Sequence, residues 1–132
     1  MNMDMQGHVF APFKLTPDKA LAEKFLQGQG ADVDLSVVPP TYMIFLRGEE
    51  RGVNLFKLLN IPREKALHGG QRYEWKQPIR WGEDYTVFVT IEKIVEKDGR
   101  GGKIWFADAC FDYYDNEGVN VLREKTSLIE RT

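Results

Sequence analysis

Apolar residues in the first half of the chain recur at the spacing of α-helices, with turn residues between the runs. Thr16 can accept a backbone N–H as the N-cap of a first helix, Pro17 suits its first position, and Asp18 favours the positive end of its dipole. We expect this helix to end near Gly28-Gln29-Gly30. A further short helix is predicted between Val53 and Leu59.

The segment from Thr41 to Leu46 is almost wholly apolar. Pro39 and Pro40 force an extended backbone just before it, so the segment is expected to begin a helix at Thr41. A helix that is apolar on most of its sides is a buried one. The sequence therefore predicts a buried helix in the middle of the domain.

The second half of the chain alternates apolar and polar residues with the period of β-strands. The predicted strands are Leu67–Trp75, Tyr85–Glu92, Trp105–Tyr113 and Val119–Ile129, with tight turns at Asp98–Gly102 and Asp115–Gly118. The last three strands form an antiparallel meander. A helical first half followed by such a sheet gives an α+β domain. The economical packing curls the sheet around the central buried helix, which is the hotdog arrangement.

Composition narrows the class of protein. The chain has 132 residues, enough for one domain, and we expect that domain to span residues 1–132. The net charge of −2 offers no electrostatic reason to bind nucleic acid or an anionic membrane. The single cysteine, Cys110, excludes an internal disulfide framework and fits a reducing compartment. Because the start also lacks the basic and apolar parts of a signal peptide, the sequence predicts a cytoplasmic protein with no membrane span.

Three segments occur in a characteristic order. They are Val37–Tyr42, Ala66–Trp75 with its Leu-His-Gly-Gly-Gln, and Pro78–Glu83 with its Pro-Ile-Arg-Trp-Gly-Glu. Together they resemble the MaoC-like hotdog hydratases and dehydratases, and most of all the branch found as an amino-terminal domain or a separate small subunit. The likeness runs from about Pro12 to Ile129.

The resemblance implies a domain that binds acyl thioesters of coenzyme A or of acyl carrier protein, with no further cofactor. In this family water adds reversibly across a trans-2-enoyl thioester and gives the (R)-3-hydroxyacyl product. A carboxylate and an imidazole activate the water and protonate the alpha carbon. A backbone N–H at the start of the buried helix stabilises the enolate oxygen.

The chain departs from the family where the catalytic pair belongs. Catalytic members carry Asp-x-Asn-Pro-x-His before the buried helix, whereas residues 29–38 here contain aspartates but neither Asn-Pro nor histidine. The two histidines of the chain, His8 and His68, lie elsewhere. The resemblance therefore implies the non-catalytic half of a two-hotdog hydratase, with the Asp/His pair supplied by a partner chain. The partner is left open between a different hotdog chain and a second copy in a homodimer.

The residues expected to contact the thioester are Pro39, Pro40, Thr41, Tyr42, His68, Gly69 and Gln71. The proline pair fixes the start of the buried helix, whose first N–H groups are free to polarise a thioester carbonyl. His68 has the alternative role of a strand-end side chain bonded to a backbone carbonyl. For Gln71, a hydrogen bond at an interface and a contact with the substrate are equally open roles. We predict no catalytic residue in this chain and no metal site, because Asp32 and Asp34 have no third ligand nearby in the sequence.

Two other functions remain open on the sequence. A self-sufficient hotdog acyl-CoA thioesterase would use Glu49 or Glu50 to position water at the thioester carbonyl. A non-enzymatic domain would bind the acyl thioester without converting it.

Overall fold

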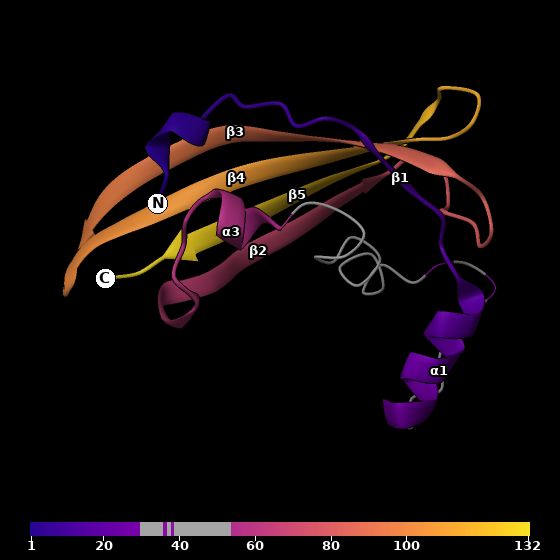
Figure 1. The fold of residues 1–132 in the computed structure, drawn as a ribbon, viewed down its shortest axis with the longest axis horizontal. Helices are drawn as coiled ribbons and strands as arrows, with labels where there is room; N and C mark the ends of the chain where they lie inside the picture. The colour runs from indigo at the N-terminus through magenta and orange to yellow at the C-terminus, as the bar shows by residue number, and fades with distance from the viewer. Residues whose placement is uncertain (30–35, 37, 39–53) are drawn as a thin grey trace.

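The computed structural model describes residues 1–29, 36, 38 and 54–132 (Figure 1). The strands are β1 (Phe13–Leu15), β2 (Ala66–Trp75), β3 (Tyr85–Gly99), β4 (Gly102–Tyr114) and β5 (Asn120–Glu130). The helices are α1 (Lys19–Gln29) and α3 (Leu55–Leu58), with 3-10 turns at Met3–Met5 and Arg63–Lys65. The expected buried helix from Thr41 lies outside the described residues, as do Pro39, Pro40, Tyr42, Glu49 and Glu50.

The strands form one antiparallel sheet in the order β1-β3-β4-β5-β2. The predicted meander is confirmed, because β3, β4 and β5 follow one another through the two expected turns. The predicted strand beginning near Leu67 is also confirmed, and it joins the sheet by pairing with β5. The β3–β4 and β4–β5 reversals are short, so these three strands lie beside their neighbours in sequence.

Alternating side chains of the long strands form the buried inner face of the sheet. The fully buried positions on β3 and β4 include Val87, Val89, Ile91, Ala107, Ala109, Phe111 and Tyr113. This is the alternation that the sequence pattern predicts, because successive side chains of a strand point to opposite faces. Burying each of the larger of these side chains stabilises the fold by about 1.5–3 kcal/mol.

The two edges of the sheet differ. Along β3 the N-terminal segment continues the pairing begun by β1, and Figure 1 shows it running beside that strand. The Gly7 N–H donates to the Ile91 carbonyl at 2.7 Å, the Ile91 N–H to the His8 carbonyl at 2.9 Å, and the Phe10 N–H to the Val89 carbonyl at 2.9 Å. The sequence pattern did not predict this short strand. At the opposite edge lies β2, ten residues long.

The first helix begins later than the sequence predicts. Asp18, not Thr16, is the capping residue, because its carboxylate accepts the N–H groups of Ala20 at 3.0 Å and Leu21 at 3.4 Å. The Thr16 hydroxyl instead donates to the carboxylate of Asp84. A carboxylate at this position also meets the positive end of the helix dipole. The predicted end near Gly28-Gln29-Gly30 is confirmed, since α1 ends at Gln29. The predicted short helix is also confirmed as α3, which Asn54 caps.

No helix within the described part of the chain is long and apolar enough to cross a membrane.

We expect Asp18→Ala to lower the free energy of unfolding by about 1 kcal/mol, since it removes the acceptor for two N–H groups of α1. Asp18→Asn is the matched control, because asparagine caps helices about as well as aspartate. Urea denaturation measures both. A loss as large in Asp18→Asn as in Asp18→Ala would contradict capping as the role of this side chain.

Candidate functional site

Polar side chains interrupt the otherwise apolar inner face where β2, β5 and β4 lie side by side. On β5, Glu124 is 0% exposed and Thr126 is 2% exposed. Both occupy inward positions of the strand, between the buried Leu122 and Leu128. Gln71 of β2 lies opposite Thr126 in the register, and Tyr113 of β4 is itself fully buried. Three strands therefore contribute to one buried polar cluster.

Hydrogen bonds connect these side chains into a continuous row. The Tyr113 hydroxyl donates to Glu124 Oε1 at 2.7 Å, and the Gln71 side-chain amide donates to Glu124 Oε2. The Thr126 hydroxyl donates to Gln71 Oε1 at 2.6 Å. At the exposed end, His68 Nε2 lies 2.9 Å from Gln71 Oε1 and 3.1 Å from Thr126 Oγ1. We call His68, Gln71, Thr126, Glu124 and Tyr113 the inner polar row.

A carboxylate removed from water is costly unless donors replace its hydration. Glu124 has a donor on each oxygen, one from β2 and one from β4. Hydrogen bonds to a charged acceptor are about twice as strong as those between neutral groups. The row therefore ties β2 and β4 to the strand between them and restricts the rotamers of its members.

Of the residues expected to contact a thioester, the structure describes His68, Gly69 and Gln71. His68 is exposed, and its ring contacts side chains rather than the backbone carbonyl of the alternative reading. Gly69 lies in a bulge between His68 and Gly70, where a Cβ would come within 2.8 Å of the Ile129 side chain. Glycine therefore allows the bulge that places His68 beside Gln71. Contact of these residues with a substrate remains a prediction.

The sequence reading missed Glu124, Thr126 and Tyr113. A signal was present, because Glu124 and Thr126 stand at the inward positions of an alternating strand, where apolar residues are the rule. Polar residues at such positions need partners. The register places Gln71 opposite Thr126, and the Gln71 side chain also reaches Glu124.

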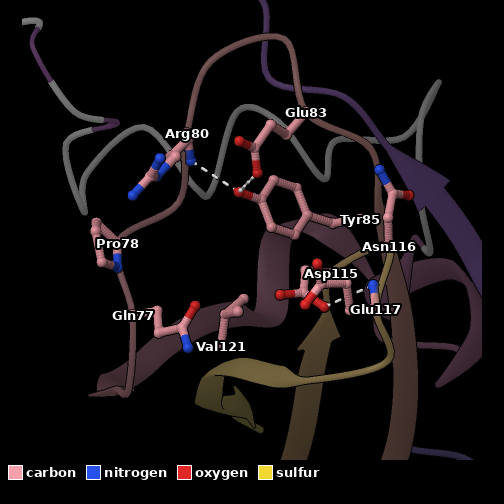
Figure 2. A pocket seen from close by; sticks show the side chains of 9 residues that line it. All are labelled: Gln77, Pro78, Arg80, Glu83, Tyr85, Asp115, Asn116, Glu117 and Val121. Atoms are coloured by element: carbon pink, nitrogen blue, oxygen red, sulfur yellow. Dashed lines mark hydrogen bonds between the residues drawn. The ribbon is translucent and has the colours of Figure 1, made fainter.

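A cavity of about 510 Å³ opens at the end of the sheet, between the β2–β3 connection and the β4–β5 turn. Figure 2 shows its lining: Gln77, Pro78, Arg80, Glu83, Tyr85, Asp115, Asn116, Glu117 and Val121. The Tyr85 hydroxyl accepts a hydrogen bond from the backbone N–H of Arg80 at 2.9 Å and donates one to the Glu83 carboxylate at 3.2 Å. Burial raises the pKa of Tyr85, and the Glu83 carboxylate adds to this rise. Because three carboxylates face one arginine, the lining is poorly suited to a phosphate group.

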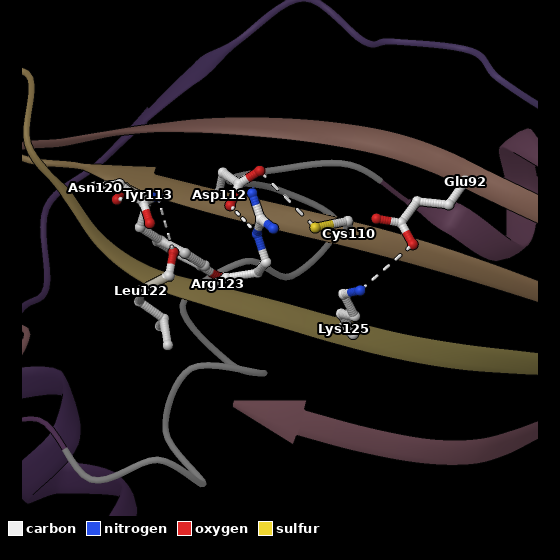
Figure 3. Close-up of polar contacts among 8 residues, drawn as sticks. All are labelled: Glu92, Cys110, Asp112, Tyr113, Asn120, Leu122, Arg123 and Lys125. Atoms are coloured by element: carbon white, nitrogen blue, oxygen red, sulfur yellow. Dashed lines mark hydrogen bonds and ion pairs between the residues drawn. The ribbon is translucent and has the colours of Figure 1, made fainter. Parts of the chain in front are cut away.

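The outer face of the sheet carries paired charges around Cys110 (Figure 3). Asp112 accepts from Arg123 at 2.8 Å, and Lys125 lies 3.8 Å from Glu92. Burial raises the pKa of the Cys110 thiol to about 12, and the carboxylates of Asp112 and Glu92 contribute further. Cys110 is a buried free thiol. No group of three or more metal-ligating side chains occurs among the residues that the structure describes.

The chain matches the model of the FAS1-like dehydratase domain region over residues 28–124. A curated relative, a UPF0336 protein of Streptomyces avermitilis, is 27% identical over 96 residues, which are 72% of this chain and 61% of the relative. The chain thus spans less than two thirds of that relative's length.

Two solved structures from Mycobacterium tuberculosis have a similar fold. The C-terminally truncated HadBC (3R-hydroxyacyl-ACP dehydratase) complex matches with a TM-score of 0.70 at 17% identity, covering 98% of this chain and 99% of that one. The ChsH1–ChsH2 complex matches with a TM-score of 0.69 at 10% identity, covering 92% and 83%. At these identities the likeness concerns the fold, and it confirms the predicted α+β hotdog class.

We expect Tyr113→Phe to lower the free energy of unfolding by about 1–3 kcal/mol, because the buried Glu124 carboxylate loses the hydrogen bond from the Tyr113 hydroxyl. The matched control is Tyr114→Phe on the next residue, whose ring packs edge-to-face on Phe88. Chemical denaturation of the two variants measures the difference. Equal losses would show that the Glu124 contact contributes nothing specific.

Cys110 is expected to react with a maleimide roughly a hundredfold or more slowly in the native chain than in the unfolded chain at neutral pH. The cause is twofold: the residue is 4% exposed, and its pKa is raised to about 12. Val119→Cys in a Cys110→Ser background gives the control, because Val119 is 41% exposed. Equally fast labelling of Cys110 and of the thiol at position 119 would contradict the burial of Cys110.

Proposed function

Since this chain belongs to the FAS1-like dehydratase domain family, we propose that it is one subunit of a heteromeric (R)-specific enoyl-thioester hydratase or 3-hydroxyacyl-thioester dehydratase. It is the non-catalytic half, a single hotdog domain over residues 1–132 that accommodates the acyl thioester. A partner hotdog chain supplies the catalytic Asp/His pair.

The open edge of the sheet carries the argument for a partner. Within the described residues, β5 is the only strand hydrogen-bonded to β2, whereas the N-terminal segment covers the β3 edge. Long exposed edges invite pairing with another chain, and monomers usually shield them. Leu67 adds an apolar side chain to this edge, 45% exposed. A second hotdog pairing with β2 would satisfy the free backbone groups and cover Leu67.

The histidines support a catalytic pair supplied from outside. His68 contacts an amide oxygen and a hydroxyl rather than a carboxylate. His8 packs edge-to-face on Phe10, with ring centres 4.6 Å apart, and its backbone covers β3. Among the residues that the structure describes, neither histidine is paired with the carboxylate that hydration of an enoyl thioester needs beside an imidazole. Both similar mycobacterial structures, the ChsH1–ChsH2 complex and the HadBC complex, are complexes, which is in keeping with a two-chain enzyme.

The decisive assay compares the chain alone, a dyad-bearing hotdog partner encoded beside it, and the two co-purified. We expect crotonyl-CoA hydration from the co-purified complex and none from the chain alone. Replacing the histidine of the partner's Asp-x-Asn-Pro-x-His with alanine should abolish the activity. Hydration by the chain alone would contradict the proposal.

The same preparation separates the alternatives. Release of free coenzyme A that is lost in Glu49→Gln or Glu50→Gln would assign a thioesterase. Binding of acyl-CoA with no turnover beside any candidate partner would assign a non-enzymatic binding domain. Native mass spectrometry of the co-purified material distinguishes a heteromer from a homodimer.

We expect Leu67→Glu to weaken partner association by roughly tenfold or more, because it places a charge on the edge that the partner would cover. Val119→Glu is the matched control, since Val119 is similarly exposed, at 41%, but lies in the β4–β5 turn. Analytical ultracentrifugation of each variant with the partner measures the effect. Equal affinity of the two variants would place the interface away from β2.

A further inference from the structure

We infer that the inner polar row sets the tautomer of His68, so that its Nδ1 atom serves as a hydrogen-bond acceptor for an N–H or O–H group of the bound acyl thioester. The choice of ligand rests on the proposed function. The setting of the tautomer does not, because it follows from the contacts of the row itself.

The direction of the hydrogen bonds begins at Glu124. A carboxylate only accepts, so both Tyr113 and Gln71 must present donors to it. This fixes the orientation of the Gln71 side chain, with its NH₂ group on Glu124 and its Oε1 on the opposite side. The buried carboxylate thereby determines which atom Gln71 shows to its other neighbours.

Those neighbours are Thr126 and His68. Gln71 Oε1 accepts the Thr126 hydroxyl at 2.6 Å, which uses the only hydrogen on that hydroxyl. Thr126 Oγ1, which lies 3.1 Å from His68 Nε2, can then only accept a hydrogen bond from the ring. Gln71 Oε1, which lies 2.9 Å from the same nitrogen, can also only accept. Both oxygens beside His68 Nε2 are therefore acceptors. A hydrogen on Nε2 satisfies both, and the neutral ring keeps its lone pair on Nδ1.

The position of His68 makes that lone pair accessible. The residue is exposed at the start of β2, on the edge assigned above to the partner hotdog, and the bulge at Gly69 turns it toward Gln71. Within the described residues, the hydrogen bonds of the His68 ring all involve Nε2. Nδ1 is thus the acceptor that the row leaves for a ligand. Glu124 and Gln71 are positioning residues, because they act only through His68.

The first test reads the tautomer directly by nitrogen-15 NMR of the histidine rings in the full chain. The chain has two histidines, so His8→Gln identifies the His68 signals unambiguously. At alkaline pH, where the rings are neutral, we expect His68 with its proton on Nε2. The informative variant is Glu124→Gln, whose amide would donate to Gln71 Oε1 and turn the Gln71 NH₂ toward His68.

In Glu124→Gln we therefore expect the His68 proton to move to Nδ1, a change that a merely structural role would not produce. Thr126→Val is the matched control, because Gln71 Oε1 still accepts from Nε2 and the tautomer should stay. If Glu124→Gln does not fold, Gln71→Leu removes the link and should give a mixture of tautomers. An Nδ1–H ring in the unaltered chain, or an unchanged tautomer in the folded variant that breaks the row, would overturn the inference.

The second test places the ligand in the complex with the dyad-bearing partner. We expect His68→Phe to weaken binding of 3-hydroxybutyryl-CoA by about tenfold, the effect of one lost hydrogen bond, and His8→Phe to leave it unchanged. Butyryl-CoA distinguishes the donor: weakening of both ligands points to a pantetheine amide, and weakening of the hydroxy ligand alone points to the 3-hydroxyl. Unchanged binding of both would overturn the ligand role of His68. If the complex binds neither ligand, the proposed function is contradicted. The NMR measurement still tests the His68 tautomer independently of that outcome.

Discussion

The inner face of the sheet depends on the hydrogen bonds that Gln71 and Tyr113 donate to the buried carboxylate of Glu124. This carboxylate stands at an inward position of β5 between the buried Leu122 and Leu128, and it is tolerated because Gln71 and Tyr113 each give it a donor. Those donors come from the strands on either side of β5. Sliding either strand by one residue would turn its donor to the other face of the sheet. The carboxylate therefore specifies the register of three strands as well as contributing to their stability.

That register has a consequence at the edge of the sheet. The bond to Glu124 orients Gln71, Gln71 orients His68, and the bulge at Gly69 brings His68 within reach. A fully buried group and an exposed imidazole on β2 are thus connected by side chains with defined donor and acceptor roles. At the opposite edge, the segment around His8 hydrogen-bonds to β3 and covers it. The asymmetry of the two edges is the main structural reason for expecting a second chain at β2.

Much of this architecture could be predicted from the sequence, because its determinants are local. The alternation of Val87, Val89 and Ile91 and the glycine-containing turns specify the meander without knowledge of long-range contacts. The start of the first helix lies two residues later than expected, since Asp18 and Thr16 are both good caps and only the contact between Thr16 and Asp84 decides between them. The inner polar row depends on pairing between strands far apart in sequence. Gln71 and His68 could be selected as candidates from a resemblance, but their link to Glu124 requires the register.

Hydrogen exchange of the β2 amides, with and without the dyad-bearing partner, tests most directly the claim that this chain is half of a two-hotdog enzyme. In the chain alone, amides of β2 that do not bond to β5 should exchange rapidly, and partner binding should slow their exchange strongly while the amides of the β4–β5 turn remain unchanged. Stable partner binding that leaves the β2 amides unprotected would contradict the account.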